Sequence, residues 1–560
     1  MKSGLVFMVL LCVMVVTAQE KKEAAQKDVD VKKEVQPPKE NAPLPKIDVP
    51  EFVITGNEKI DLNIQSKTED DEERYFVPDK PSVGVRSAAA DGAISPKQTK
   101  SFSRTPTAMN GKVFAGYGFY LTPQFDGWFG QHDQSNSFIL NGYYTSTEGH
   151  EKNADGWKGG FGGRGRYVLP ESSTVLPYAQ LNGDVQYDRQ SYRAYGSLSP
   201  TRTRDLSTFD LSFGIGSRYA LPYHSLSGLD YTGTIGLENF AANDSLRSSE
   251  SDLYFNTVAS TRFVDMALRG QLEYRTTSYT MYLPGLQSGQ WFILKADGLT
   301  SLLPSLQCAF ALEQFFYRGN FGVTSGRLYP QVELRYFMTD NASLYAGFSP
   351  NVERNTLSSL IKQNRYINFN AFVAPSDVKV QVQAGMEYTP IEELTANAKF
   401  SYKNINNYPT FLDSTDAKVW EVTYLSNVRS TRIDFSILYR LDRNKNVTAY
   451  FSAQQVVQRD SLGTLPYIPK YSFGTVYHHY FDFGLHVEGL AEYIASRYTN
   501  FSNTHTTAGY VYTSVKADIE LFEHFRGYAE IQNLINQHYY IWNGYRERSM
   551  YLLLGVSYNW

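Results

Sequence analysis

The sequence predicts an all-β fold, a transmembrane antiparallel outer-membrane β-barrel of about 22 strands. Aromatic residues make up 15% of the 560 residues, including 42 Tyr and 34 Phe, and these side chains favour strands and lipid–water boundaries. From about residue 111 to the last residue, apolar and polar side chains alternate, as in strands with one apolar face. Beyond the N-terminal region, no segment is apolar enough to cross a membrane as a helix. A membrane-embedded chain must then cross as strands in a closed barrel.

The alternation is clearest in four runs of the C-terminal half. They span residues 378–388, 394–403, 433–441 and 511–521. Runs of about 9–13 residues suit a tilted strand that crosses a membrane, and they exceed the 5–6 residues typical of soluble sheets. A soluble β-sandwich would show the same alternation. The length of the runs therefore favours the barrel.

The connections between the runs alternate in length. Short turns are expected near 339–340, 390–392, 442–445, 481–483 and 522–525, and longer polar loops near 350–377, 404–417, 458–470, 496–507 and 535–548. Short turns on the periplasmic side and long loops outside are typical of outer-membrane barrels. Counting strands backwards from a periplasmic C-terminus gives about 22, an even number as bacterial single-chain barrels require. The candidate strands in this count include 174–187 and 207–220.

The polar face of these runs is expected to form a wet pore wall of mixed charge. The candidate pore-wall residues are Lys399, Lys403, Arg440, Lys516, Asp518 and Glu520. Such charges tune selectivity in pores, although any solvated strand face also carries them.

The last strand carries a candidate assembly signal. Leu552, Leu554, Val556, Tyr558 and Trp560 share one face and end on a terminal aromatic residue. We interpret them as the signal that the barrel assembly machinery recognises and as a face for outer-membrane lipid. An ordinary amphipathic final strand is the alternative.

The N-terminal region predicts export. Lys2, an apolar run over residues 4–16 and small residues ending at Ala18 are typical of a signal peptide. The expected division is a signal peptide at 1–18, a charged, disordered, Pro-containing linker at 19–50, a short periplasmic or lumenal segment at 51–110 that could be a reduced plug, and the barrel at 111–560. The expected location is the outer membrane of a Gram-negative bacterium, with the N-terminal segment periplasmic.

Other function classes are disfavoured. The chain has 53 Lys+Arg and 57 Asp+Glu, a net charge of -4, so it lacks the basic balance of a nucleic-acid-binding protein. Its two cysteines are too few for a disulfide scaffold or a multi-cysteine zinc site. The match of residues 160–165 to G-x-G-x-x-G lacks a following helix, and neighbouring His478 and His479 would face opposite ways on a strand. We expect no catalytic residues, no cofactor and no metal site, and therefore not an enzyme.

The C-terminal residues 526–560 resemble the end of a TonB-dependent outer-membrane receptor. Tyr528-Ala529-Glu530-Ile531-Gln532-Asn533-Leu534-Ile535-Asn536 is similar to the family's penultimate strand and the Asn-Leu-Phe-Asn/Asp type sequence after it. Residues 402–408 resemble another recurring strand-to-loop piece of the family. The resemblance implies a 22-stranded barrel that moves solutes across the outer membrane.

The chain departs from that family before the barrel. The resemblance implies a folded plug of well over a hundred residues, yet only about 60 residues, 51–110, precede the first strand. Ile47, Asp48, Val49, Pro50, Glu51, Phe52, Val53, Ile54 and Thr55 are similar to the family's energy-coupling box and plug start, which implies TonB as a partner. Any short β-prone segment after a linker would look alike.

Two functions follow as expectations. The first is a channel or transporter that moves solutes passively or with a partner plug, since a barrel of this size has a lumen wide enough to require filling. The second is a structural or docking barrel of an envelope complex, with a periplasmic or surface lipoprotein as partner.

Overall fold

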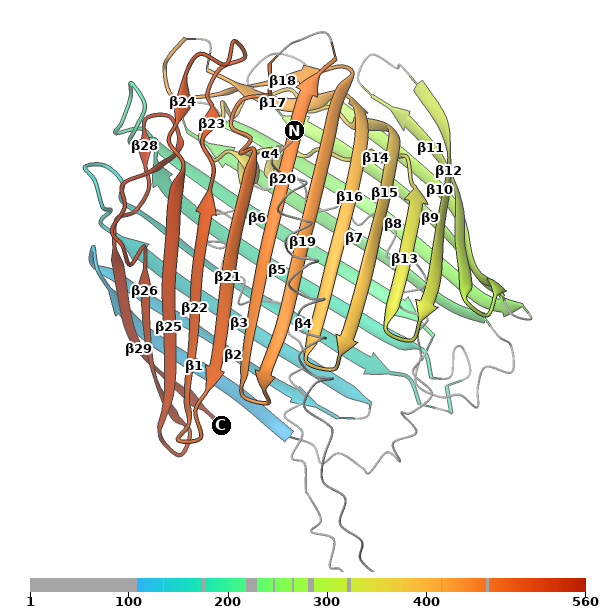
Figure 1. Cartoon of the computed structure of the whole chain (residues 1–560), viewed down its shortest axis with the longest axis horizontal. Helices are drawn as coiled ribbons and strands as arrows, with labels where there is room; N and C mark the ends of the chain where they lie inside the picture. The colour runs from blue at the N-terminus through green and yellow to red at the C-terminus, as the bar shows by residue number, and fades with distance from the viewer. Residues whose placement is uncertain are drawn as a thin grey trace, which may run out of the picture. The chain divides into compact units, whose positions relative to one another are not determined.

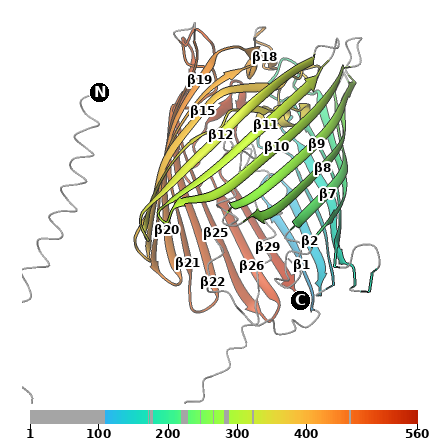
Figure 2. The same cartoon turned by 90° about the vertical axis from the view of Figure 1, so that its right-hand side faces the viewer.

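The computed structural model describes residues 108–560, apart from gaps at 134, 171, 174–177, 218–228, 245–246, 264–265, 281–286, 320–323, 414 and 460–462. The expected signal peptide (1–18), the linker (19–50) and nearly all of the segment 51–110 lie outside the described residues. What the structure describes is a β-barrel (Figures 1 and 2).

The barrel wall is made of strands that follow one another along the chain. In chain order they are β1 (Ala108–Gly118), β2 (Thr122–His132), β3 (Asn136–Thr147), β4 (Gly156–Val168), β5 (Gln180–Arg193), β6 (Thr203–Gly216), β7 (Leu229–Asn243), β8 (Arg247–Phe263), β9 (Met266–Thr280), β10 (Gln287–Leu303), β11 (Leu306–Arg318), β12 (Thr324–Thr339), β13 (Ala342–Phe348), β14 (Asn351–Glu353), β15 (Ser376–Ile391), β16 (Leu394–Asn406), β19 (Val428–Asp442), β20 (Lys445–Gln458), β21 (Tyr471–Tyr480), β22 (Leu485–Ile494), β25 (Tyr510–Phe522), β26 (Phe525–Gln532) and β29 (Tyr551–Asn559). The sheet has 23 strands, but β13 and β14 occupy one position because both pair with β15. The wall therefore has 22 positions, and the predicted fold class is confirmed.

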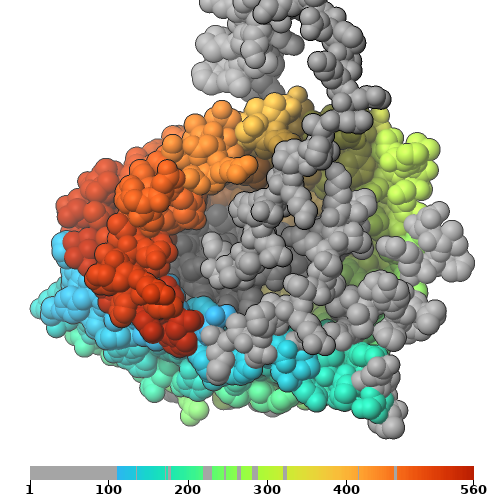
Figure 3. All heavy atoms as spheres, turned by 90° about the horizontal axis from the view of Figure 1, so that it is seen from below, coloured from blue at the N-terminus to red at the C-terminus, as the bar shows by residue number. Residues whose placement is uncertain are grey.

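The first and last strands close the barrel. β1 pairs antiparallel with β29, from Lys112 opposite Asn559 to Gly118 opposite Leu553. The backbones of Gly111 and Trp560 exchange two further hydrogen bonds of 3.1 and 3.0 Å. Figure 3 looks into one end of the barrel and shows the blue first strands beside the red last strands. Closure pairs β1 and β29 with each other and leaves neither as a free edge.

Alternation places apolar side chains outside and polar side chains inside. On β16 and β19, Phe400 stands opposite Ile433, and both are exposed on the outer surface. The next pair along the same strands, Lys399 and Asp434, faces the lumen. A large exposed apolar exterior with a polar interior is the arrangement of a transmembrane barrel.

The two ends of the barrel differ in their connections. At the turn end, where the C-terminus lies, residues 340–341, 392–393, 443–444 and 523–524 suffice to join strands. At the opposite, loop end, long connections carry the short hairpins β17–β18 (Tyr408–Leu412, Glu421–Leu425), β23–β24 (Arg497–Tyr498, Thr506–Thr507) and β27–β28 (Tyr540–Trp542, Tyr545–Arg546) (Figure 1). The predicted alternation of turns and loops in the C-terminal half is confirmed.

Two predicted strands were displaced along the chain. We expected strands at 174–187 and 207–220, whereas β5 and β6 run from Gln180 to Arg193 and from Thr203 to Gly216. The polar residues that follow Tyr187 look like a loop, yet they continue β5, and alternate ones among them face the lumen. Asp188, for example, accepts a hydrogen bond of 2.7 Å from the Tyr143 hydroxyl.

Tyrosine rings cover glycines on neighbouring strands of the inner face. Tyr254 stands opposite Gly236, and Tyr345 opposite Gly385; a Cβ at either glycine would meet the ring. Tyr143–Gly160 and Tyr450–Gly474 repeat the arrangement. A ring packed over a glycine compensates for the missing side chain and permits local bending. The G-x-G-x-x-G match of residues 160–165 lies in strand β4, without the helix that a nucleotide site needs.

The ladder between β12 and β13 ends at a pair of prolines. Val332 opposite Phe348 is its last pair, and the same register would next bring Gln331 opposite Ser349 and then Pro330 opposite Pro350. Neither residue has a backbone N–H to donate. The chain after Pro350 continues as β14, which pairs only with β15.

Candidate functional site: the polar lumen and the loop that crosses it

A ladder of charged groups lines the lumen near the turn end. The His486 ring lies 2.9 Å from an Asp518 carboxylate oxygen, and the Arg526 Nε donates to the same carboxylate at 3.0 Å. Two residues farther from the turn end on the same two strands, Lys516 lies 3.7 Å from Glu488. Through these cross-strand pairs of opposite charge, the side chains form one polar surface that faces the water of the lumen.

The other candidate pore-wall residues lie at different heights of the same inner face. Lys403 is buried and forms an ion pair of 2.9 Å with Glu353 of β14. Arg440 and Glu520 are exposed, and Arg440 donates to the carbonyl of Glu392 at the turn end. The structure therefore does not bring the six residues into one site. They are distributed along the wall.

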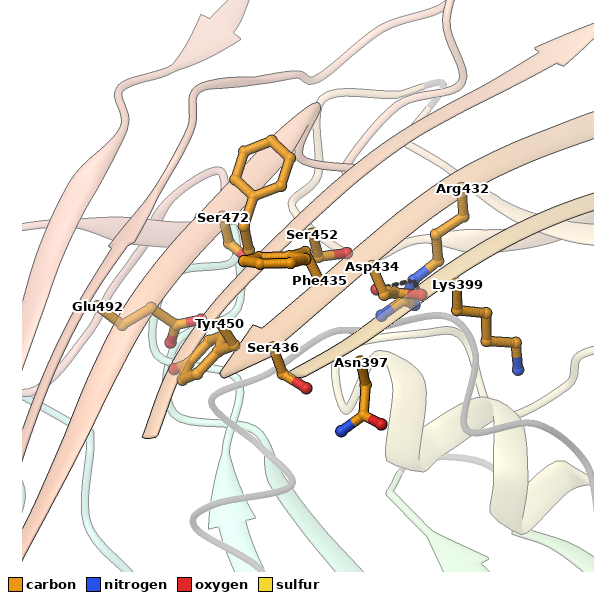
Figure 4. A pocket seen from close by; sticks show the side chains of 11 residues that line it. Asn397, Lys399, Arg432, Asp434, Phe435, Ser436, Tyr450, Ser452, Ser472 and Glu492 are labelled. Carbon is orange, nitrogen blue, oxygen red and sulfur yellow. Dashed lines mark hydrogen bonds and ion pairs between the residues drawn. The ribbon is translucent and has the colours of Figure 1, made fainter. Parts of the chain in front are cut away.

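Lys399 lies in a recess of the inner wall of about 410 Å³. Its lining residues are Asn397, Lys399, Arg432, Asp434, Phe435, Ser436, Tyr450, Phe451, Ser452, Ser472 and Glu492. Within it, Arg432 and Asp434 form an ion pair of 2.8 Å (Figure 4). Two cations, two carboxylates and several hydroxyls make the recess polar without a strong net charge. It suits a polar solute better than a highly charged one.

The loop between β14 and β15 folds inwards. This crossing loop, residues 354–375, contains the helix α4 (Leu357–Gln363). Thr356 caps the helix by accepting a hydrogen bond of 2.9 Å from the Ser359 N–H. Leu357, Leu360 and Ile361 share one helix face, and all three are buried.

The crossing loop reaches strands on another part of the wall. The Leu357 N–H donates to Glu250 of β8 at 2.6 Å, and the Tyr192 hydroxyl of β5 donates to the Arg365 carbonyl at 2.6 Å. Along the wall, β9 to β12 lie between β14 and β8, which is the nearer of these two strands. The loop therefore crosses the lumen from one part of the barrel wall to another.

An apolar cluster packs the crossing loop against the loop-end hairpins. Trp420 is fully buried, and its backbone exchanges hydrogen bonds with Tyr366 and Asn368. Tyr366 stacks on Tyr545 of β28 with ring centroids 3.5 Å apart. Burial raises the pKa of Tyr366 well above its usual value, so this hydroxyl stays neutral. The hydrophobic core of the described residues thus lies at the loop end of the lumen.

The histidine pair behaves as the strand alternation predicts. The His478 imidazole faces the lumen, where it lies 3.6 Å from Glu488. His479 points to the other face and stacks on Phe481 with centroids 3.7 Å apart. In the part of the chain that the structure describes, no group of three or more His, Cys, Asp or Glu residues is arranged to hold a metal ion.

The family of the chain follows from its sequence. A profile of the family described as TonB dependent receptor-like, beta-barrel matches residues 83–534. The chain belongs to this family. No curated protein matches the sequence closely enough to count as a relative.

Solved structures of this receptor fold superimpose on the barrel at low sequence identity. The FrpB iron transporter from Neisseria meningitidis has 9% identity and a TM-score of 0.64, with 81% of each chain covered. The ferric-catecholate import receptor Fiu from E. coli K12, in its closed form, has 11% identity and a TM-score of 0.62, with 82% of each chain covered. The copper transporter OprC has 10% identity and a TM-score of 0.63, with 82% of each chain covered. The barrel is therefore an outer-membrane receptor barrel in fold.

The candidate assembly residues lie on the outer face of the last strand of this receptor-like barrel. Leu554 and Val556 are 54% and 51% exposed, and Tyr558 and Trp560 stack with centroids 5.7 Å apart. Leu553, between Leu552 and Leu554, points inwards and packs on Phe114. The candidate energy-coupling residues, Ile47 to Thr55, lie outside the described residues.

Sequence analysis missed the crossing loop. It placed residues 350–377 among the long polar loops outside the barrel. The signal that could have found the loop is the spacing of Leu357, Leu360 and Ile361, which is that of one apolar helix face. Phe369, fully buried in the same loop, adds to that signal. A segment with this many apolar side chains is better suited to packing inside the protein than to lying in water.

No helix within the described residues is long and apolar enough to cross a membrane.

Proposed function

We propose that this barrel moves polar solutes across the outer membrane through its lumen, passively or with a partner that fills it. The observation that carries the proposal is the wet inner wall, from the His486–Asp518–Arg526 group near the turn end to the Arg432–Asp434 recess above it. An apolar exterior around such a lumen provides a water-filled route through lipid. FrpB and OprC, which share the fold, are named as iron and copper transporters.

The N-terminal segment and the last strand are proposed to serve partners. Ile47 to Thr55 would engage TonB or a periplasmic lipoprotein, which places this segment in the periplasm. Leu552 to Trp560 would engage the barrel assembly machinery. The family's energy coupling supports the first assignment, and the outward-facing terminal aromatics support the second.

Bilayer conductance tests the proposed transport. Purified, refolded protein in planar bilayers is expected to carry ions, and neutral sugars are expected to enter liposomes that contain it. A barrel that neither conducts nor admits sugars, even after the crossing loop is removed, would reject the solute path.

Docking is the second candidate function. The hairpins at the loop end are held by the packed cluster around Trp420. In a neighbouring loop, the Leu198 side chain is 77% exposed. A rigid platform with exposed apolar residues suits a surface lipoprotein partner. Co-purification of one partner with the full chain, lost on Leu198→Asp, would favour this function.

A further inference from the structure

Acidic side chains beneath the crossing loop form a row that the wall alone does not neutralise. Asp210, Glu238 and Asp252 stand directly opposite one another on β6, β7 and β8. Like charges in opposed positions repel. Arg275 of β9 reaches two of them, with 3.0 Å to Glu238 and 3.2 Å to Asp252. Arg275 also lies 3.5 Å from Glu273, so its charge is shared among three carboxylates.

The crossing loop supplies a second cation to this row. The Arg354 guanidinium lies 3.5 Å from Glu250 and 3.8 Å from Glu238, and it also pairs with Asp252. The side chains of Glu250 and Asp252 are only 5% and 2% exposed. Carboxylates buried so deeply are costly without a partner. Moving Arg354 away would leave Asp252 paired with Arg275 alone, and it would take from Glu250 the one cation that pairs with it among the described residues.

Further contacts fix the start and the far side of the crossing loop. The Leu357 N–H donates to the same Glu250 carboxylate. Arg204 of β6 donates to the carbonyls of Arg365 and Ile367, at 2.8 and 2.6 Å. These acceptors are neutral, so this anchor responds little to a change in the acidic row.

The two ends of the loop are held on its own side of the lumen. Glu353, just before the loop, pairs with Lys403 of β16. Asp377, just after it, accepts a hydrogen bond of 2.9 Å from the Tyr329 hydroxyl. The β12–β13 ladder stops at Val332, before Pro330, so no β12–β13 pairing has to break when the segment after Pro350 moves. The loop thus has fixed ends and an ionic contact with the facing wall.

We propose that the crossing loop is the gate of the lumen and that Arg354 is its latch. The proposal rests on the solute path of the proposed function. In the closed state Arg354 pairs with Glu238, Glu250 and Asp252. In the open state the loop stays attached at β14 and β15 while Arg354 and α4 leave the facing wall. Weakening the Arg354 pairs therefore favours the open state without altering the barrel.

The test compares Arg354→Gln with wild type in planar bilayers, with hydrogen exchange as a second measurement. We expect a several-fold rise in mean conductance and faster exchange of amides in 357–369, with unchanged exchange in β7 and β8. Arg354→Lys, which keeps the charge, is expected to conduct like wild type. The matched control is Arg335→Gln, which removes another lumenal arginine. Arg335 forms an ion pair of 2.8 Å with Glu387 and does not pair with the crossing loop.

A third variant separates failure of the gate from failure of the solute path. Residues 355–374 are replaced by a short Gly-Ser linker, and folding of each variant is checked by its resistance to unfolding in detergent. If the linker variant conducts strongly while Arg354→Gln stays as closed as wild type, the latch is wrong. If Arg335→Gln opens the barrel as much as Arg354→Gln, the effect is general and the latch is again wrong. If the linker variant carries no ions, the solute path and the gate that depends on it are both rejected.

Discussion

Neighbouring residues on one strand of this barrel face different environments, lipid on the outside and water in the lumen. Ile437 and Ser436 of β19 show the contrast, since Ile437 shares the outer face with Ala396 and Ser436 lines the recess with Asn397. We expect Ile437→Arg to place a charge in lipid at a cost of about 2–4 kcal/mol near mid-membrane, whereas Ser436→Arg costs little. Unfolding of both variants in bilayers measures the difference. Equal stabilities would show that the facing assigned to β19 is wrong.

His150 makes one contact of the loop end sensitive to acid. Its imidazole lies 2.7 Å from the Arg546 carbonyl oxygen, and burial, helped by the charge of Arg548, lowers its pKa below the usual value. The neutral ring is thus favoured in the folded loops. Its contribution to stability is complete above the unfolded pKa of about 6.5 and is lost as pH falls through the lowered folded pKa.

Hydrogen exchange of residues 533–550 at several pH values checks this prediction. Protection of these amides, relative to their intrinsic exchange rate at each pH, is expected to fall below about pH 6.5, and His150→Gln is expected to flatten that dependence. An identical pH profile in the variant would assign the acid sensitivity to another group.

The direction of single side chains could be predicted from sequence, but their partners could not. Period-two alternation placed Lys516 and Asp518 on the polar face of one strand, and both face the lumen. Their contacts with Glu488, His486 and Arg526 depend on the register between strands. Alternation within one strand carries no information about that register.

At the scale of elements, β29 both closes the barrel and presents the candidate assembly signal. Trp560 pairs with Gly111 through its backbone, while Tyr558 stands opposite Phe525 on the outer face. Deleting Trp560 together with Tyr558→Ser is expected to reduce insertion into the outer membrane, because it removes the terminal aromatics without touching the lumen. The amount of folded barrel in outer-membrane fractions measures the effect. Wild-type amounts would contradict the assembly role.

Strands with an apolar outer face were predictable as elements, whereas the crossing loop was not. Sequence separates β15, β16 and β19 clearly because lipid selects one apolar face. In a barrel the same polar residues suit a water-filled lumen and an external loop. The sequence pattern therefore predicted β5 too early in the chain, because polar residues of that strand line the lumen. The pattern also placed residues 350–377 outside, although most of that loop's apolar side chains are buried.

For the whole molecule, the strand number could be predicted and the filling of the lumen could not. An even number with alternating connections follows from chain geometry, so a walk from the C-terminus reached the 22 wall positions of the structure. What occupies the lumen depends on contacts between distant segments, such as Tyr366 with Tyr545. The expectation of a lumenal segment at 51–110 or of a partner plug took no account of the crossing loop.

Deleting residues 19–110 tests how much the N-terminal region closes the barrel. The crossing loop remains in this variant, and we expect conductance to rise only modestly. Planar-bilayer recordings compare the two chains, with the linker replacement of 355–374 as a positive control. A wild-type barrel that is closed and opens widely on this deletion would show that the short segment acts as a plug.

The most direct test of the account asks whether solutes pass along the polar inner face. Cysteines replace Lys399 and Asp518 on that face, and Phe400 and Ile519 beside them on the outer face, in a Cys308→Ser chain. Each is made in the full chain and in the linker variant, and a bulky charged thiol reagent is added during conductance recording. The account predicts that current falls when position 399 or 518 is modified and stays constant for 400 and 519. Equal block from both faces, or block from the outer positions alone, would contradict it.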